Sequence, residues 1–186
     1  MSEFGRRLVH VSGTVVPVLY LVDVLAWDHV RYLLLSATVV GTALEVLRLR
    51  GVIDWDVYGR FTRDYEQDRI AGYALAIVGA TVTAWIFGPR VAVPALMMLT
   101  IGDPVSGVLS RDSLEIKQVY VLMATFGVCL AIASLLFVPF WSAASGALAA
   151  TLADGVKPTI AGRVIDDNLS IPIASAVAMQ AVLLVT

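Results

Sequence analysis

The chain has 186 residues, of which 59% are hydrophobic and 15% are charged, with 13 Lys and Arg against 15 Asp and Glu. This composition excludes a disordered chain, a coiled coil and a disulfide scaffold. Its share of charged residues is also well below the roughly 25% that soluble domains average. The mean hydropathy of +0.84 indicates that the solvent of this chain is a lipid bilayer. The formal net charge of −2 gives no reason to expect nucleic-acid binding.

Seven apolar runs are candidates for membrane-spanning helices, since one such helix takes roughly 20 residues. They cover residues 8–26, 32–47, 70–87, 91–109, 119–140, 141–156 and 171–185. Too few residues remain between them for a separate soluble domain. The sequence therefore predicts an all-α fold, a polytopic integral membrane helix bundle of about seven transmembrane helices, built as a single transmembrane domain over residues 1–186.

Two of these runs have an unusual composition. Residues 91–101 are too few to cross a hydrocarbon core of about 30 Å, and the run continues only through Gly102-Asp103-Pro104. Because proline disturbs a regular helix, we expect a broken helix there, next to protein or a wet cavity. Residues 141–156 are dominated by Ala, Gly and Ser, which let helices approach closely. We expect this helix to be central and buried.

The positive charges predict the orientation of the bundle. With a cytoplasmic N-terminus, only Arg31 and Arg90 fall on the outer side, and the other eleven of the 13 Lys and Arg residues fall on the inner side. Cytoplasmic loops of membrane proteins carry such an excess. We therefore expect a cell-membrane protein with a cytoplasmic N-terminus. The aromatic-containing polar stretch 48–69 is expected to lie at the inner interface.

With this topology, polar residues gather at the inner ends of the spans. The acids and the histidine are His10, Glu45, Glu66, Asp103, Asp154, Asp166 and Asp167, and the nearby cations include Arg111, Lys117 and Lys157. A carboxylate deep in the membrane costs about 2.5–3.5 kcal/mol, so it should be paired or hold an ion. Carboxylate oxygens suit Mg²⁺, and cations hold phosphate oxygens. The pattern indicates a membrane enzyme that handles phosphates at its cytoplasmic face.

The same residues also have structural interpretations. His10 can form an ordinary hydrogen bond at the interface, and Glu45 can pair with an arginine one turn later. Lys117 and Lys157 can be simple inner-loop charges. The segment 166–168 can cap the last helix, because Asp and Asn are good N-caps, and capping does not exclude metal binding. A small transporter or a non-catalytic membrane subunit remains open as an alternative.

Four stretches of the chain match the motifs of one family in order. They are Arg6-Arg7-Leu8-Val9-His10 with Gly13, Arg63-Asp64-Tyr65-Glu66 with Gly72, Ile101-Gly102-Asp103-Pro104-Val105-Ser106 with Gly107, and Asp166-Asp167-Asn168-Leu169-Ser170-Ile171-Pro172. On these stretches the chain resembles the CTP-dependent polyprenol kinases, which include dolichol and phytol kinases and are distant relatives of the phosphatidate cytidylyltransferases. The chain departs from the family's Lys-Ser-x-Glu-Gly motif, where it reads Glu115-Ile116-Lys117-Gln118-Val119.

The resemblance implies a membrane lipid kinase. It would transfer a phosphoryl group from CTP, as co-substrate, to an isoprenoid alcohol of the dolichol, polyprenol or geranylgeraniol type, with Mg²⁺ as cofactor. The related alternative is a cytidylyltransferase, which uses CTP and a lipid phosphate to make a CDP-lipid and releases pyrophosphate.

The resemblance also implies roles for individual residues. The expected Mg²⁺ ligands are carboxylates, with Asp103 and Asp167 assisted by Asp166 or Asp154. The expected contacts to CTP are Arg111, Lys117, Lys157 and Asn168. The catalytic candidates are Asp103, His10 and Lys117, and either Asp103 or His10 could take the proton of the lipid hydroxyl.

Overall fold

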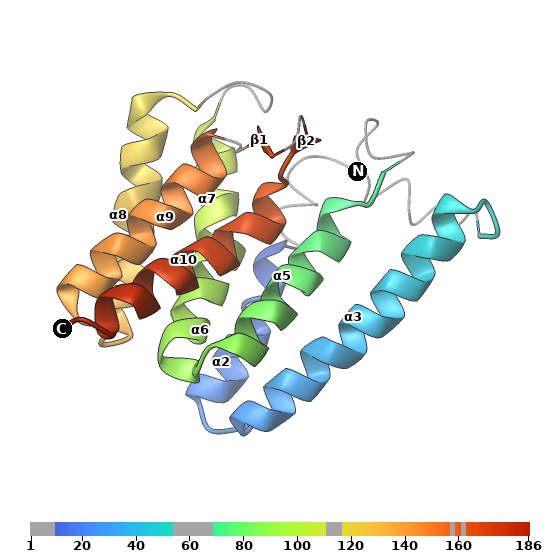
Figure 1. Cartoon of the computed structure of the whole chain (residues 1–186), viewed down its shortest axis with the longest axis horizontal. Helices are drawn as coiled ribbons and strands as arrows, with labels where there is room; N and C mark the ends of the chain where they lie inside the picture. The colour runs from blue at the N-terminus through green and yellow to red at the C-terminus, as the bar shows by residue number, and fades with distance from the viewer. Residues whose placement is uncertain (1–9, 54–68, 111–116, 157–158, 161–162) are drawn as a thin grey trace.

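The computed structural model describes residues 10–53, 69–110, 117–156, 159–160 and 163–186, and this part of the chain is helical apart from one short hairpin (Figure 1). The seven helical segments are α2 (Val15–Leu21), α3 (Trp27–Leu49), α5 (Gly72–Ile86), the continuous run of α6 (Pro89–Met97), η2 (Met98–Gly102) and α7 (Asp103–Leu109), then α8 (Val119–Leu135), α9 (Phe140–Val156) and α10 (Asp167–Leu183). Strands β1 (Thr159–Ile160) and β2 (Arg163–Val164) pair antiparallel between α9 and α10. The predicted all-α class is confirmed.

Six of the seven predicted runs coincide with helices to within a few residues, and the first does not. Regular helix ends at Leu21 in α2, and Asp23 adopts a left-handed φ of 58°. Among the described residues, two helical runs, Trp27–Leu49 and Pro89–Leu109, are long and apolar enough to cross a membrane. The other apolar helices have 10–17 residues.

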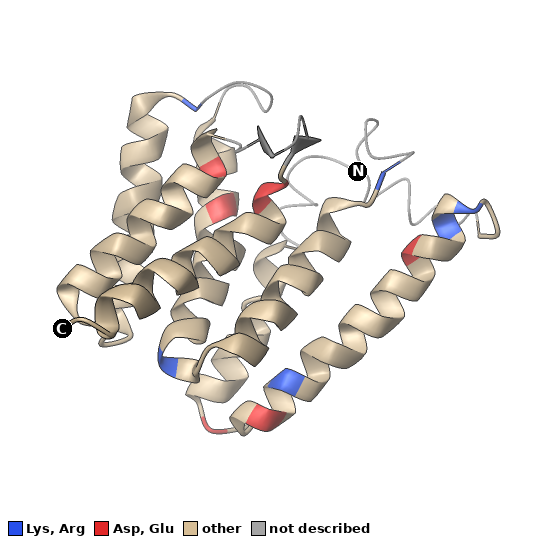
Figure 2. Cartoon of the chain, viewed as in Figure 1, with Lys and Arg blue, Asp and Glu red and all other residues tan. Residues whose placement is uncertain are grey.

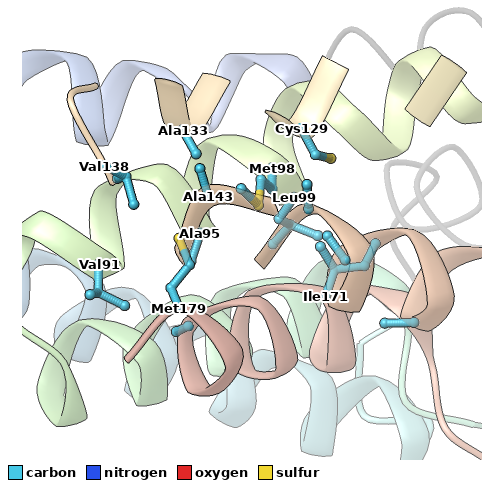
Figure 3. Packing of buried hydrophobic residues seen from close by; sticks show 14 residues of the cluster. Val91, Ala95, Met98, Leu99, Cys129, Ala133, Val138, Ala143, Ile171 and Met179 are labelled. Atoms are coloured by element: carbon cyan, nitrogen blue, oxygen red, sulfur yellow. The ribbon is translucent and has the colours of Figure 1, made fainter. Parts of the chain in front are cut away.

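The centre of the bundle is the run α6–η2–α7. Every residue from Val91 to Leu96 is buried, and α10 packs against α6, α9 and α5, while α3 packs against α5 at the edge (Figure 1). Apolar side chains of α6, η2, α8, α9 and α10 form the main core (Figure 3). The prediction that residues 141–156 form the central buried helix is right for one face only, because Trp141 and Leu148 of α9 are exposed.

The fourth helix is continuous, so the prediction of a broken helix is wrong. Gly102 and Asp103 keep right-handed helical dihedrals, and Met98–Gly102 forms a π-helical turn. In an α-helix the ring of Pro104 would clash with the carbonyl four residues earlier. A π-turn is a local widening of the helix, often at a functional site, and here it accommodates the proline and delivers Asp103 at the start of α7.

A buried carboxylate joins α3 to the start of α5. Glu45 is 3% exposed. Its two oxygens accept hydrogen bonds from Arg48 Nη2 at 2.6 Å and Nε at 3.0 Å, from the Ala71 amide at 2.7 Å and from the Tyr73 hydroxyl at 2.7 Å. The structural interpretation of Glu45 is confirmed, and this carboxylate fixes the C-terminal end of α3.

Candidate metal and phosphate site

The charged side chains of the described residues lie towards the two ends of the bundle, and the middle of the helices carries none (Figure 2). Acidic residues gather at one end, where α7 begins, α9 ends and α10 begins. These helices come together there because successive segments run in alternating directions (Figure 1). Residues that are up to 64 positions apart in the chain, Asp103 and Asp167, therefore meet at one end.

Three carboxylates lie at the centre of this site. One oxygen of each of Asp103, Asp154 and Asp167 lies within 4.8 Å of the others. Asp103 opens α7, Asp154 lies in the last turn of α9, and Asp167 is the first residue of α10. Asp154 is buried, whereas Asp103 and Asp167 are half-buried, so the triad is closed on the protein side and open on the other. We call these three residues the acidic triad.

The acidic triad fits a hard divalent cation. Three carboxylates at this spacing repel one another, and a bound cation relieves that repulsion. Mg²⁺ takes oxygen ligands at about 2.0–2.1 Å in an octahedron, so directly bound oxygens lie about 3 to 4 Å apart. Oxygens within 4.8 Å of one another are close to this spacing, and Mg²⁺ commonly keeps several waters as its remaining ligands.

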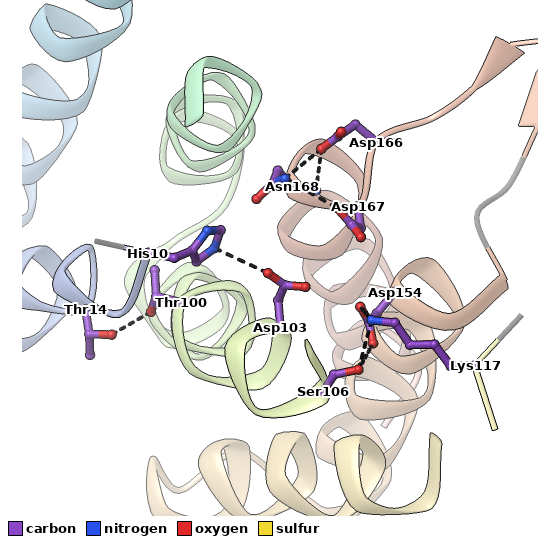
Figure 4. A network of polar contacts seen from close by, with 10 residues as sticks. All are labelled: His10, Thr14, Thr100, Asp103, Ser106, Lys117, Asp154, Asp166, Asp167 and Asn168. Carbon is purple, nitrogen blue, oxygen red and sulfur yellow. Dashed lines mark hydrogen bonds and ion pairs between the residues drawn. The ribbon is translucent and has the colours of Figure 1, made fainter. Parts of the chain in front are cut away.

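Asp154 is held on both oxygens by neighbouring side chains (Figure 4). The Lys117 ammonium group donates to Oδ1, and the Ser106 hydroxyl donates to Oδ2 at 2.5 Å. Lys117 also donates to Ser106 Oγ at 2.9 Å. All three side chains are buried, and the Lys117 backbone N–H bonds to Gly155 O at 3.3 Å. Lys117, predicted to contact phosphate, thus lies beside the acidic triad and contacts a carboxylate.

His10 approaches the acidic triad from the opposite side. Its Nε2 atom lies 3.9 Å from Asp103 Oδ2 (Figure 4). The segment is held in place by the Thr14 hydroxyl, which donates to Thr100 Oγ1 at 2.8 Å. Gly13 permits the contact, because a Cβ there would lie 3.1 Å from the Thr100 methyl. His10 is therefore placed beside the carboxylate with which it shares the candidate role of proton acceptor.

Asp166 caps α10. Its Oδ1 accepts hydrogen bonds from the Asn168 backbone N–H at 3.0 Å and from Asn168 Nδ2 at 2.8 Å. Asn168 Nδ2 also donates to Asp167 Oδ1 at 3.3 Å. The capping interpretation of this segment is confirmed for Asp166, and Asp167 is the residue of the pair that lies in the acidic triad.

The structure brings most of the predicted site residues together at this end of the bundle: His10, Asp103, Lys117, Asp154, Asp166, Asp167 and Asn168. Arg111 and Lys157, as well as the polar stretch around Glu66, lie outside the described residues. The sequence analysis missed Ser106 as a site residue. Its spacing of three from Asp103 could have shown it, because residues i and i+3 share a helix face.

Comparisons of the chain with protein-family models, with curated proteins and with solved structures find no match.

Proposed function

We propose that the protein is an integral membrane kinase that transfers a phosphoryl group from CTP to an isoprenoid alcohol at the cytoplasmic face. The acidic triad of Asp103, Asp154 and Asp167 carries this proposal, because Asp103 and Asp167 come from two of the stretches that resemble the kinase family and lie together with a third carboxylate, Asp154. Lys117 beside the triad is a cation, which can neutralise phosphate charge. His10 is the second candidate, next to Asp103, for accepting the proton of the lipid hydroxyl.

The surface of the bundle supports the membrane part of the proposal. Helix α3 is a 23-residue apolar helix, and only 17% of its most apolar 18-residue stretch is buried, unlike the core helix of a soluble protein. Large apolar side chains such as Val39, Leu135 and Phe137 are exposed. The 17-residue helices are about 25 Å long at 1.5 Å per residue, close to the hydrocarbon thickness of about 30 Å.

Aromatic residues at the end opposite the acidic triad support the same placement. Arg31 lies over the rings of Trp27 and Trp85, at 6.0 and 5.9 Å from their centroids. Tyr32 packs edge-on against Trp85, and Tyr20 against Trp27. Trp and Tyr are enriched where a membrane meets water. We call these five residues the aromatic collar, and we propose that it lies at the outer interface.

The proposed reaction follows from this chemistry. The alcohol oxygen forms a bond to the terminal phosphorus of CTP, the bond from that phosphorus to its bridging oxygen breaks, and CDP leaves. The hydroxyl proton passes to His10 or Asp103, the two candidate acceptors. Mg²⁺ held by Asp103, Asp154 and Asp167 would supply neutralisation of phosphate charge. The apolar alcohol would reach this end of the helices from the bilayer.

Purified protein with Mg²⁺, terminally labelled CTP and a panel of isoprenoid alcohols tests the proposal. We expect label in the lipid and unlabelled CDP as the second product. Release of pyrophosphate from CTP with a lipid phosphate would establish the cytidylyltransferase instead. A folded protein that gives neither product would refute both enzymes and favour a transporter or a non-catalytic subunit.

A further inference from the structure

Ser106 occupies a position that the reaction itself does not explain. Its side chain is fully buried, so it cannot reach a substrate as a nucleophile. It accepts a hydrogen bond from Lys117 Nζ at 2.9 Å and donates one to Asp154 Oδ2 at 2.5 Å. A hydroxyl has one proton to donate and two lone pairs that accept, so the Lys117 contact directs that proton toward Asp154.

Asp154 depends on these two partners for its orientation. The carboxylate comes from the last turn of α9, and Lys117 and Ser106 each contact a different oxygen of it. Each carboxylate oxygen retains acceptor capacity after one hydrogen bond, since an ionised carboxylate offers about four lone-pair sites. The two donors fix the plane of the carboxylate and leave capacity on the side that faces Asp103 and Asp167.

We propose that Ser106 is a positioning residue that orients Asp154 toward Asp103 and Asp167 and thereby sets the affinity of the acidic triad for a divalent cation. This inference rests on the metal part of the proposed function and adds Ser106 to it. Partners that hydrogen-bond to metal-ligating side chains fix the geometry of the ligand, and their loss typically weakens metal binding by about 10–100-fold. In the structure the donor to Oδ2 of Asp154 is Ser106, and Lys117 donates to Oδ1, so removal of the hydroxyl takes away the hydrogen bond at Oδ2.

Ser142 provides a matched control for this role. It is also a fully buried serine, and its hydroxyl donates one hydrogen bond, to Met179 O at 2.9 Å. It lies in the first turn of α9, whereas Asp154 lies in the last. Replacing either serine with alanine removes one buried hydroxyl, and only Ser106→Ala removes a contact to Asp154.

The experiment measures Mn²⁺ binding to purified full-length protein in detergent by electron paramagnetic resonance, for the wild type, Ser106→Ala and Ser142→Ala. Mn²⁺ serves as a spectroscopic substitute for Mg²⁺, and Asp167→Asn shows whether the signal comes from the acidic triad. We expect Ser106→Ala to raise the Kd for Mn²⁺ at least about tenfold, with the Kd of Ser142→Ala unchanged.

Two results would overturn the inference. Equal Mn²⁺ affinity of Ser106→Ala and the wild type would remove Ser106 from the site and leave the metal part of the proposed function intact. A wild type that binds no Mn²⁺ would overturn both. A protein that shows the expected Mn²⁺ series but no transfer from CTP would refute the proposed kinase and leave the role of Ser106 standing. If Ser106→Ala does not fold, Ser106→Cys, a weaker donor of similar size, replaces it in the same series.

Discussion

Asp103 is the residue on which the proposed chemistry most depends. Replacement by Asn keeps the shape and removes the charge, so we expect turnover to fall by orders of magnitude, as when a group that stabilises developing charge is lost. We expect thermal stability to stay level or rise, because the substitution relieves repulsion among three carboxylates within 4.8 Å. Activity and melting temperature in detergent measure the two effects on one preparation. Asp28→Asn is the control, since the Asp28 side chain is 76% exposed and pairs only with Arg31 among the described residues.

A structural ion pair would give the opposite result. If Asp103 only paired with His10, at 3.9 Å, the variant would lose stability and keep its specific activity. That outcome would refute the catalytic assignment of Asp103.

Glu45 is predicted to act through stability alone. Its carboxylate is buried and accepts four hydrogen bonds from three residues. Glu45→Gln places an amide N–H₂ against some of these donors, and breaking a buried charge pair costs about 3–5 kcal/mol. We expect a loss of about 3 kcal/mol or more in unfolding free energy, measured by denaturant titration, with turnover per folded molecule unchanged. A fall in specific activity without a loss of stability would contradict this assignment.

At the scale of the helices, sequence patterns predicted positions well and packing less well. Apolar run length located six of the seven helices, because a bilayer or a bundle core selects the same long apolar segments. The same measure failed for residues 8–26, where the turn at Asp23 ends α2 early. The expectation of a break at Gly102-Asp103-Pro104 was also wrong. A proline predicts that the regular α-helix is disturbed, but it cannot distinguish a broken helix from a π-turn.

The sequence predicted which residues belong to the candidate site, but not which of them contact one another. Spacing and charge sign selected the acids, and alternating helix direction explains why three of them meet. The partner of Lys117 depends on side-chain packing between α7 and α9, which no local pattern encodes. Ser106 carries no charge that marks it in an apolar helix, and its spacing of three from Asp103 was the one local signal that could have shown it.

Helix α5 packs closely on the first turn of α10, the helix that begins with Asp167 of the acidic triad. A Cβ on Gly79 would lie 3.0 Å from Asn168 O, 3.1 Å from Leu169 O and 3.1 Å from the Pro172 ring. Backbone carbonyls cannot move aside as a flexible side chain can, so Gly79→Ala must push α5 away from the start of α10. We expect a loss of about 1–3 kcal/mol and weaker Mn²⁺ binding, because Asp167 begins that helix.

Gly127→Ala is the matched control for this prediction. Gly127 lies inside α8, and a Cβ there would meet nothing within 4 Å. Alanine is a better helix former than glycine by about 1 kcal/mol, so this variant should be as stable as the wild type or more stable. Denaturant titrations of both variants test the pair. Equal stability of the two would show that α5 and α10 are not in close contact at Gly79.

For the molecule as a whole, the two charged ends predict which side of the membrane each faces. The acidic triad lies at one end, and the aromatic collar with Asp28 and Arg90 at the other (Figure 2). A kinase that uses CTP must expose the triad to the cytoplasm, because the nucleotide comes from there. The collar then lies at the outer face, which agrees with the excess of Lys and Arg expected inside.

Single cysteines test this orientation, because the native Cys129 is buried and should give little background. In intact cells, Asp28→Cys is expected to react with a membrane-impermeant maleimide, and Arg50→Cys, just past the inner end of α3, only after the membrane is permeabilised. The two positions are separated by 21 residues of apolar helix, so they cannot both lie at one face if α3 spans. Labelling of Arg50→Cys alone from outside would invert the bundle, place the acidic triad outside the cell and contradict the use of CTP. Labelling of both from outside would show that α3 does not cross the membrane.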